Sequence, residues 1–280
     1  MKPRELLYML GLRPKHRHYG HDTIELADPN GGPPLRWVRW AHPKSRDLRP
    51  DLDELALLRR FLREGDFAID VGAHVGDTTL PMALAVGGSG LVIAMEPNPA
   101  TFEILELNAA ANPGRTRIDC LNAAAMDQEG EFEFHYNDPG LTNGGYQKDV
   151  RWWQHASFFA VKVKGIRLES LVREHHAARI PRLRYIKTDC EGYDDQVIRS
   201  INGLVAQARP VMRIEVNRYL PQDRLAAFHA DLRALDYRLF HYAGFVDGRR
   251  DEIDPRAPVK LPETIDVLAL PRERAESILG

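Results

Sequence analysis

The sequence predicts an α/β fold built on a doubly wound, mostly parallel sheet of about seven strands. Two observations support this class: short apolar runs recur along the chain, and amphipathic stretches of helical length separate most of them. The 280 residues, 44% hydrophobic and 28% charged, can bury a core of that size. The sequence contains no internal repeat and no low-complexity tract, which excludes a solenoid or a linker protein.

Seven apolar runs are the predicted strands of this sheet. Those typical of buried parallel strands cover 67–72, 90–97, 117–124, 183–189 and 211–217, and two later runs cover 237–245 and 264–270. Between them, amphipathic segments predict helices at 77–86, 100–111, 194–207 and 224–236. Strands and helices in this alternation form the β–α–β units of a doubly wound sheet.

Two segments interrupt the alternation and set the expected domain organisation. Residues 1–50 are an N-terminal extension with a basic helix and a small hairpin, whose strands 24–26 and 35–40 flank the turn signal DPNGGPP. Residues 51–280 are the main domain, and the leucine spacing at 51–66 predicts its first helix. An insertion at about 130–166 contains two alternating strands, 130–138 and 158–166, joined by a long loop.

The overall composition narrows the classes of partner. A net charge of −2 and a pI of about 6.6 give no basic field, so nucleic acid is not an expected partner. Two cysteines favour a reducing compartment, and we expect a cytoplasmic protein. No apolar run reaches the roughly 18 residues of a membrane span, so we expect no transmembrane segment and no signal peptide. The sequence does not indicate an oligomeric state.

The stretch IDVGAHVGDTTL (69–80) predicts a ligand-binding turn between a strand and a helix. Glycines permit positive φ and leave bare backbone, and the helix N-terminus offers free N–H groups. A dinucleotide fingerprint would place glycine at position 74, where His74 stands, which disfavours a nicotinamide cofactor. The expected cofactor-binding residues of this loop are Asp70, Gly72, Ala73, His74, Gly76, Asp77 and Thr78.

Acidic residues at two strand ends favour a cationic nucleoside. Asp70 suits a ligand such as S-adenosylmethionine, which carries an ammonium and a sulfonium. Glu96, followed by Pro97 and Asn98, ends the next strand, where a carboxylate accepts hydrogen bonds from ribose hydroxyls. The structural alternatives are a helix cap at Asp70 and an ordinary strand-end acid at Glu96. Joint placement at the carboxyl ends of adjacent strands favours the functional interpretation.

Four blocks together resemble the FkbM family of class I S-adenosylmethionine-dependent methyltransferases: IDVGAHVG (69–76), VIAMEPNP (92–99), YIKTDCEGYD (185–194) and PVMRIEVN (210–217). The resemblance covers about residues 60 to 217. It implies a seven-stranded Rossmann-like sheet with the last strand antiparallel, and O-methylation of a hydroxyl of a sugar, glycolipid or other natural product. Two positions depart from the family pattern, His74 where asparagine is usual and Tyr193 where a small residue is common.

The block KTDCEG carries the candidate catalytic residues, Asp189 and Glu191. Asp189 can deprotonate or orient an attacking hydroxyl, the task that an alcohol nucleophile requires. Asp189, Glu191 and Glu215 are also candidate ligands of a divalent metal, with Asn217 close by. A metal-free site, in which Glu191 caps a helix and Glu215 binds a backbone amide, is the favoured alternative.

Two further sets of residues complete the expected site. Ala123, Ala124 and Asp127 follow the third strand and are candidates for adenine binding, with a simple turn as the alternative. An aromatic wall for the acceptor is expected from the insertion loop, with a local core beneath the loop as the alternative. The candidate substrate-binding residues are Tyr146, Trp152, Trp153, His155, Glu215 and Asn217.

Three functions remain open at this point. An S-adenosylmethionine-dependent methyltransferase is the leading hypothesis, with a small-molecule or saccharide acceptor. A nicotinamide-dependent oxidoreductase is the second, although the glycine pattern disfavours it. A non-catalytic nucleoside-binding domain is the third.

Overall fold

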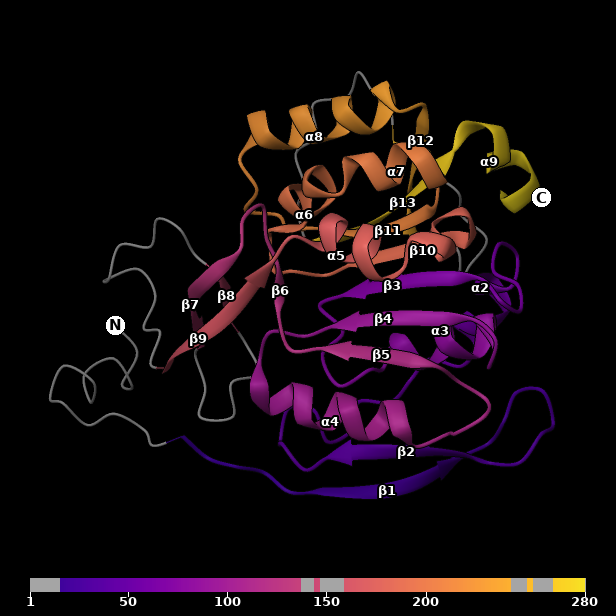
Figure 1. The fold of residues 1–280 in the computed structure, drawn as a ribbon, viewed down its shortest axis with the longest axis vertical. Coiled ribbons are helices and arrows are strands. Elements are labelled where there is room, and N and C mark those ends of the chain that lie inside the picture. The colour runs from indigo at the N-terminus through magenta and orange to yellow at the C-terminus, as the bar shows by residue number, and fades with distance from the viewer. Residues whose placement is uncertain (1–15, 137–143, 147–158, 243–250, 254–263, 280) are drawn as a thin grey trace, which may run out of the picture.

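The computed structural model describes residues 16–136, 144–146, 159–242, 251–253 and 264–279. Its centre is a seven-stranded sheet in the order β12-β13-β11-β10-β3-β4-β5 (Figure 1). All neighbouring pairs from β11 to β5 are parallel, whereas β13 is antiparallel to both β11 and β12. This confirms the predicted sheet and its antiparallel last strand. The strands are β3 (Phe67–Val71), β4 (Leu91–Met95), β5 (Ile118–Leu121), β10 (Leu183–Thr188), β11 (Val211–Val216), β12 (Tyr237–His241) and β13 (Ile265–Pro271).

Helices cover both faces of this sheet, as a doubly wound fold requires. The apolar runs of β3 and β4 are buried on both faces, so alternate side chains enter two different cores. One core is covered by α5 (Leu168–His175), η1 (Ala177–Arg182), α6 (Asp194–Ser200), α7 (Asn202–Ala208) and α8 (Gln222–Ala234). The other is covered by α2 (Glu54–Leu58), α3 (Thr79–Val86) and α9 (Arg272–Leu279), with part of α4 (Pro99–Ala110).

Two of the predicted helices have different boundaries in the structure. The helix expected at 51–66 is wrong beyond Leu58, because bonds from Arg60 N to Leu57 O and from Phe61 N to Leu58 O turn the chain within three residues. The apolar residues that suggested a longer helix, among them Leu62, are nevertheless buried through these turns. The helix expected at 194–207 is divided at Ile201 into α6 and α7. Helices α5 and α9 were not predicted.

The predicted N-terminal hairpin is confirmed as an antiparallel pair, β1 (His21–Leu26) and β2 (Leu35–Trp40). It lies beside α4 (Figure 1), and two asparagines of that region join it. The Asn108 side chain accepts from Val38 N and donates to Val38 O, while Asn112 makes the same pair of bonds with Arg36. The hairpin therefore extends the main domain, and the boundary at residue 50 stays a prediction. The basic helix expected before it lies outside the described residues.

The insertion forms a second, four-stranded sheet in the order β6-β9-β7-β8. Its strands are β6 (Ala124–Ala125), β7 (Gly130–Tyr136), β8 (Gly144–Tyr146) and β9 (Phe159–Ile166). The antiparallel pairing of β7 with β9 confirms the two strands predicted there. Because β6 directly follows β5 along the chain, this sheet begins at the carboxyl edge of the central one. Within the described residues, no helix is long and apolar enough to cross a membrane.

Candidate functional site

A cavity lies at the carboxyl ends of β3, β4 and β10, where open α/β sheets bind ligands. Residues from all of the expected cofactor segments and from the KTDCEG block meet there. Predicted residues that line it are Gly72, His74, Glu96, Pro97, Asn98, Ala123, Ala124, Asp189 and Glu191. Predicted residues that are described but do not line it are Asp70, Ala73, Gly76, Asp77, Thr78, Asp127, Glu215 and Asn217.

The glycine at position 72 is required by the protein backbone itself. Gly72 has a φ of 77°, and a Cβ added to it would lie 1.9 Å from the carbonyl oxygen of Asp189. The absence of a side chain therefore lets the turn after β3 approach the turn after β10. Gly76 has a φ of 93°, and a Cβ added to it would lie 3.0 Å from the Leu105 side chain of α4, so the positive φ is the stronger reason for glycine there.

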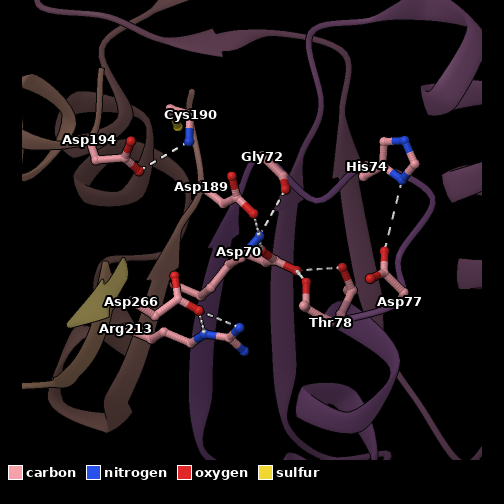
Figure 2. A network of polar contacts seen from close by, with 12 residues as sticks. Asp70, Gly72, His74, Asp77, Thr78, Asp189, Cys190, Asp194, Arg213 and Asp266 are labelled. Carbon is pink, nitrogen blue, oxygen red and sulfur yellow. Dashed lines mark hydrogen bonds and ion pairs between the residues drawn. The ribbon is translucent and has the colours of Figure 1, made fainter. Parts of the chain in front are cut away.

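His74 adopts a left-handed backbone conformation, with a φ of 49°. Asparagine tolerates this conformation better than most residues, and histidine is also enriched there, which accounts for the family's preference and for the exchange in this chain. The His74 N–H donates to Glu96 Oε2 at 2.9 Å, so the loop is joined to the end of β4. Burial lowers the pKa of the His74 imidazole, which faces Asp77 at 4.0 Å (Figure 2).

Glu96 presents a buried carboxylate to the cavity, with 7% of the residue exposed. One oxygen accepts from His74 N and the other from Asn98 N at 2.8 Å. Burial raises the pKa of Glu96, while these backbone donors and the nearby His74 act in the opposite direction. Each carboxylate oxygen can accept a second hydrogen bond, so Glu96 can still receive the hydroxyls of a ligand.

Asp70 lies under the cavity and not on its wall. It is fully buried, and its Oδ2 accepts from the hydroxyls of Thr78 and Thr79 at 2.8 and 2.7 Å (Figure 2). Its Oδ1 lies 3.4 Å from Lys187 Nζ. The carboxylate thus fixes the start of α3 and balances a buried ammonium.

Lys187 is the cation that joins the two turns, a role that its position in the sequence did not reveal. Its Nζ donates to Gly72 O at 3.0 Å and lies 3.6 Å from Asp189 Oδ2. Although burial opposes it, the charges of Asp70, Asp189 and Asp77 raise the pKa of Lys187 above its usual value. Lys187 is therefore a permanent positive charge that holds the Asp189 carboxylate at the cavity.

Asp189 and Glu191 are the most accessible acids of the cavity. Strand β10 ends at Thr188, and 47% of the Asp189 side chain is exposed. Glu191 has a φ of 52°, and the chain turns back through Gly192 at a φ of 97°. Burial and the nearby Asp189 charge raise the pKa of Glu191. The buried carboxylate of Asp194 fixes this turn by accepting from Cys190 N at 3.0 Å (Figure 2). It also accepts from Gly192 N at 3.3 Å.

Glu215 lies on β11 next to this turn. Its Oε2 is buried and has no hydrogen-bond partner among the described residues. Burial raises the pKa of Glu215 to about 8, and the charges of Asp189 and Asp194 add to the shift. Asn217 Oδ1 accepts from Tyr219 N at 3.0 Å, which shapes the loop after β11. In the described part of the chain, no group of three or more acidic, histidine or cysteine side chains is arranged to hold a metal ion.

The three residues expected to bind adenine differ in burial and in their position relative to the cavity. Ala123 and Ala124 are buried on the cavity wall, whereas Asp127 is exposed outside it. Asp77 and Thr78 stand at the start of α3, and burial raises the pKa of Asp77 to about 6 against the charge of Lys187. The backbone of Tyr146 belongs to β8; Trp152, Trp153 and His155 lie outside the described residues.

Cavity residues that sequence reasoning missed include two from the insertion, Phe134 and Tyr136. Their signal was the alternation in GEFEFHY, which places Phe132, Phe134 and Tyr136 on one face of β7. Tyr193 and Cys190 also line the cavity. Burial raises the pKa of the Cys190 thiol well above its usual value, as expected for a packing residue and not for a nucleophile.

Comparison with known proteins identifies the family. The Methyltransferase FkbM domain matches residues 70–245, more than half of the chain. The chain belongs to the FkbM methyltransferase family. This confirms the resemblance seen in the four sequence blocks, and the sheet with its antiparallel β13 is the one that the family implied.

The individual proteins that the chain resembles are distant in sequence. Hexuronic acid methyltransferase AglP of Haloferax volcanii is 27% identical over 156 residues, which cover 56% of this chain and 58% of that protein. The chain thus spans less than two thirds of the length of this relative. The crystal structure of methyltransferase FkbM from Methylobacillus flagellatus has 13% identity and a TM-score of 0.44, over 73% of this chain and 43% of that one. Fibrillarin from Aeropyrum pernix, with natively bound S-adenosyl-L-methionine, has the same identity and TM-score over 92% and 85%.

Proposed function

We propose that this FkbM protein is an S-adenosylmethionine-dependent O-methyltransferase that acts on a hydroxyl of a sugar, glycolipid or other natural product. The observation that carries the proposal is a single cavity in which a buried carboxylate at the end of β4 and two accessible carboxylates after β10 face a wall of small residues. Family membership favours methyl transfer over the nicotinamide alternative.

The residues of the cavity fit such a cofactor. Glu96 would hold the ribose, since its carboxylate has acceptor capacity left in a buried position. Ala123 and Ala124 leave room for a flat ring beside Pro97 and Asn98. Asp189 and Glu191 would favour the cationic amino-acid end. Ala73, Gly76, Asp77 and Thr78 shape the loop from behind, and contact by the exposed Asp127 stays a prediction.

The chemistry of the chain itself centres on Asp189. When bound, S-adenosylmethionine supplies an electrophilic methyl group. Lys187 lies beside the Asp189 carboxylate at the cavity, where Asp189 would accept the proton of the acceptor hydroxyl or align that hydroxyl for attack. Glu191 adds negative charge on the same turn. Glu215, Asn217 and the aromatic residues Tyr146, Trp152, Trp153 and His155 remain proposed for the acceptor.

A titration with S-adenosylhomocysteine tests the cofactor. We expect micromolar binding by the wild-type protein and a loss of at least tenfold in Glu96→Ala, because a buried carboxylate contact to hydroxyl groups is removed. Glu103→Ala, on the exposed face of α4, is the matched control and should leave the Kd unchanged. Binding of NADH in place of S-adenosylhomocysteine would support the oxidoreductase instead.

The acceptor is tested with methyl-labelled S-adenosylmethionine and a panel of neutral and uronate-containing saccharides. The relative named for hexuronic acid supports saccharides as the first class to screen. A methyl group on a hydroxyl oxygen resists mild alkali, whereas a methyl ester on a carboxylate is cleaved by it, so alkaline release shows which oxygen is modified. Cofactor binding with no transfer to any acceptor would favour the non-catalytic alternative.

Metal dependence is tested in the same assay. Because no three donor side chains of the described residues are arranged around one point, we expect activity to survive EDTA. Loss of activity with EDTA and recovery with Mg²⁺ would return Asp189, Glu191 and Glu215 to the role of metal ligands.

A further inference from the structure

Tyr136 brings a polar group from the insertion into the cofactor cavity. On β7, Glu133 and His135 point away from the small core of the insertion, while Phe134 and Tyr136 are buried in it. Both aromatic residues line the same cavity as Glu96. Only 3% of Tyr136 is exposed, so its ring is held within the packing beside the cavity.

The Tyr136 hydroxyl is available to a ligand. No hydrogen bond to it is found among the described residues, and it is not one of the fully buried polar atoms that lack a partner, so it is open to the cavity that Tyr136 lines. Burial raises the pKa of Tyr136, and the charge of Glu96 adds to the shift, so the phenol keeps its proton. Tyr136 is therefore a neutral donor close to the Glu96 carboxylate, which can only accept.

The insertion holds Tyr136 in a fixed place relative to the cavity wall. Strand β9 pairs with β6 on one side and with β7 on the other, so Ala124 and Tyr136 belong to one small sheet. A Cβ on Gly165 of β9 would lie 2.2 Å from the Phe132 ring, and this glycine lets the aromatic face of β7 lie close to β9. The cluster of Ala124, Met126, Phe134, Tyr136 and Val163 completes the packing.

We propose that strand β7 forms part of the nucleoside half of the cavity, and that the Tyr136 hydroxyl donates a hydrogen bond to the ribose held by Glu96. This inference rests on the proposed cofactor. A ribose hydroxyl is both a donor and an acceptor, so the carboxylate satisfies its protons while the phenol satisfies its oxygen. The insertion is then part of the cofactor site, and Tyr136 is a specificity residue for the nucleoside.

Binding of two probes to Tyr136→Phe tests the inference. S-adenosylhomocysteine contains the whole cofactor except the methyl group, and 5′-methylthioadenosine retains the nucleoside but lacks the amino-acid end. We expect the Kd of both probes to rise about three- to tenfold, because one hydrogen bond to the nucleoside is lost. Tyr237→Phe is the matched control, since Tyr237 lies on β12 away from the cavity and is also buried, but its hydroxyl donates to Pro210 O. The Kd of the Tyr237→Phe variant for both probes should stay at the wild-type value.

A double-mutant cycle with Glu96→Gln shows whether the two groups hold the same ribose. We expect the combined loss to differ from the product of the single losses, as for groups that share a ligand atom. An unchanged Kd in Tyr136→Phe, a loss confined to S-adenosylhomocysteine, or strictly multiplicative losses would each overturn the role of Tyr136 and leave the proposed function standing. Failure of the wild-type protein to bind either probe would instead overturn the proposed cofactor, and this inference with it.

Discussion

The turns after β3 and after β10 have similar backbones and opposite side-chain arrangements. Both contain a non-glycine residue at positive φ, His74 in the first and Glu191 in the second, with a glycine close by. The acid before the first turn is internal: Asp70, near the end of β3, is fully buried and accepts hydrogen bonds from two threonines. In the second, Asp189 is half exposed at the cavity and has Lys187 as its charge partner.

This difference indicates that the two turns at the carboxyl edge of the sheet have different roles. The first turn is a rigid support whose polar groups are used by the protein itself. The second presents carboxylates to whatever enters the cavity. Lys187 connects the two, because its ammonium touches Asp70, the Gly72 carbonyl and Asp189. Substitutions in the first turn should therefore reduce stability, and those in the second should reduce activity.

Lys187→Met should have the largest effect, because it removes the connection. It leaves the buried Asp70 without a counter-charge, and we expect the free energy of unfolding to fall by about 3–5 kcal/mol, measured by urea denaturation. Lys162→Met is the control, since that exposed lysine pairs with Glu131 on the insertion and should cost less than about 1 kcal/mol. Adding Asp70→Asn to Lys187→Met should restore part of the loss. Equal costs for the two lysines would contradict the central role of Lys187.

Asp189→Asn tests the second turn. We expect kcat to fall about 10²–10³-fold, because proton acceptance at the cavity is lost, with the melting temperature nearly unchanged. Asp231→Asn is the matched control: its side chain is 54% exposed and pairs with Arg199, but it lies on α8. Methyl transfer at the wild-type rate in Asp189→Asn would remove this residue from the chemistry.

Gly72→Ala tests the approach of the two turns. The added Cβ would meet the Asp189 carbonyl at 1.9 Å, and we expect a loss of about 3 kcal/mol in the free energy of unfolding. Gly114→Ala separates the clash from backbone strain, because Gly114 has a similar φ of 78° and open space around its Cβ position. This control should cost about 1 kcal/mol. A similar cost at both glycines would mean that the turns are not in close contact.

The pH dependence of stability tests the fixed part of the second turn. Burial raises the pKa of Asp194 to about 7, and the folded state therefore binds a proton more tightly than the unfolded state. Its contribution is largest below the unfolded pKa near 4 and is lost as pH rises to about 7. We expect the wild-type protein to lose roughly 3–4 kcal/mol over this range relative to Asp194→Asn, because each unit of pKa difference corresponds to about 1.4 kcal/mol, as measured by urea denaturation at several pH values. If the difference in unfolding free energy between the wild-type protein and Asp194→Asn did not change with pH, the raised pKa of Asp194 would be contradicted.

The sequence predicts the site better in its position than in its details. The apolar runs of β3, β4 and β10 fix which residues stand at the carboxyl edge, because parallel strands end together there. They do not fix which way a strand-end side chain faces, and Asp70, expected at the ligand, pairs with Lys187 beneath it. Tyr136 was missed for a related reason. Alternation shows that it shares a face with Phe134, but only the position of β7 in the folded chain shows that both residues line the cavity.

His74→Asn should have the smallest effect of these substitutions. It tests whether the left-handed backbone conformation selects the residue in the turn after β3. Asparagine adopts the left-handed conformation readily, and the backbone N–H that donates to Glu96 is retained, so we expect stability within about 0.5 kcal/mol of wild type. His74→Val should instead cost about 1–2 kcal/mol, because a β-branched side chain is strained at a φ of 49°. His135→Val on β7 is the control, since the extended backbone of a strand accepts valine. If valine at 74 were tolerated as well as asparagine, the turn would be able to relax, and the left-handed conformation would not be what selects the residue at this position.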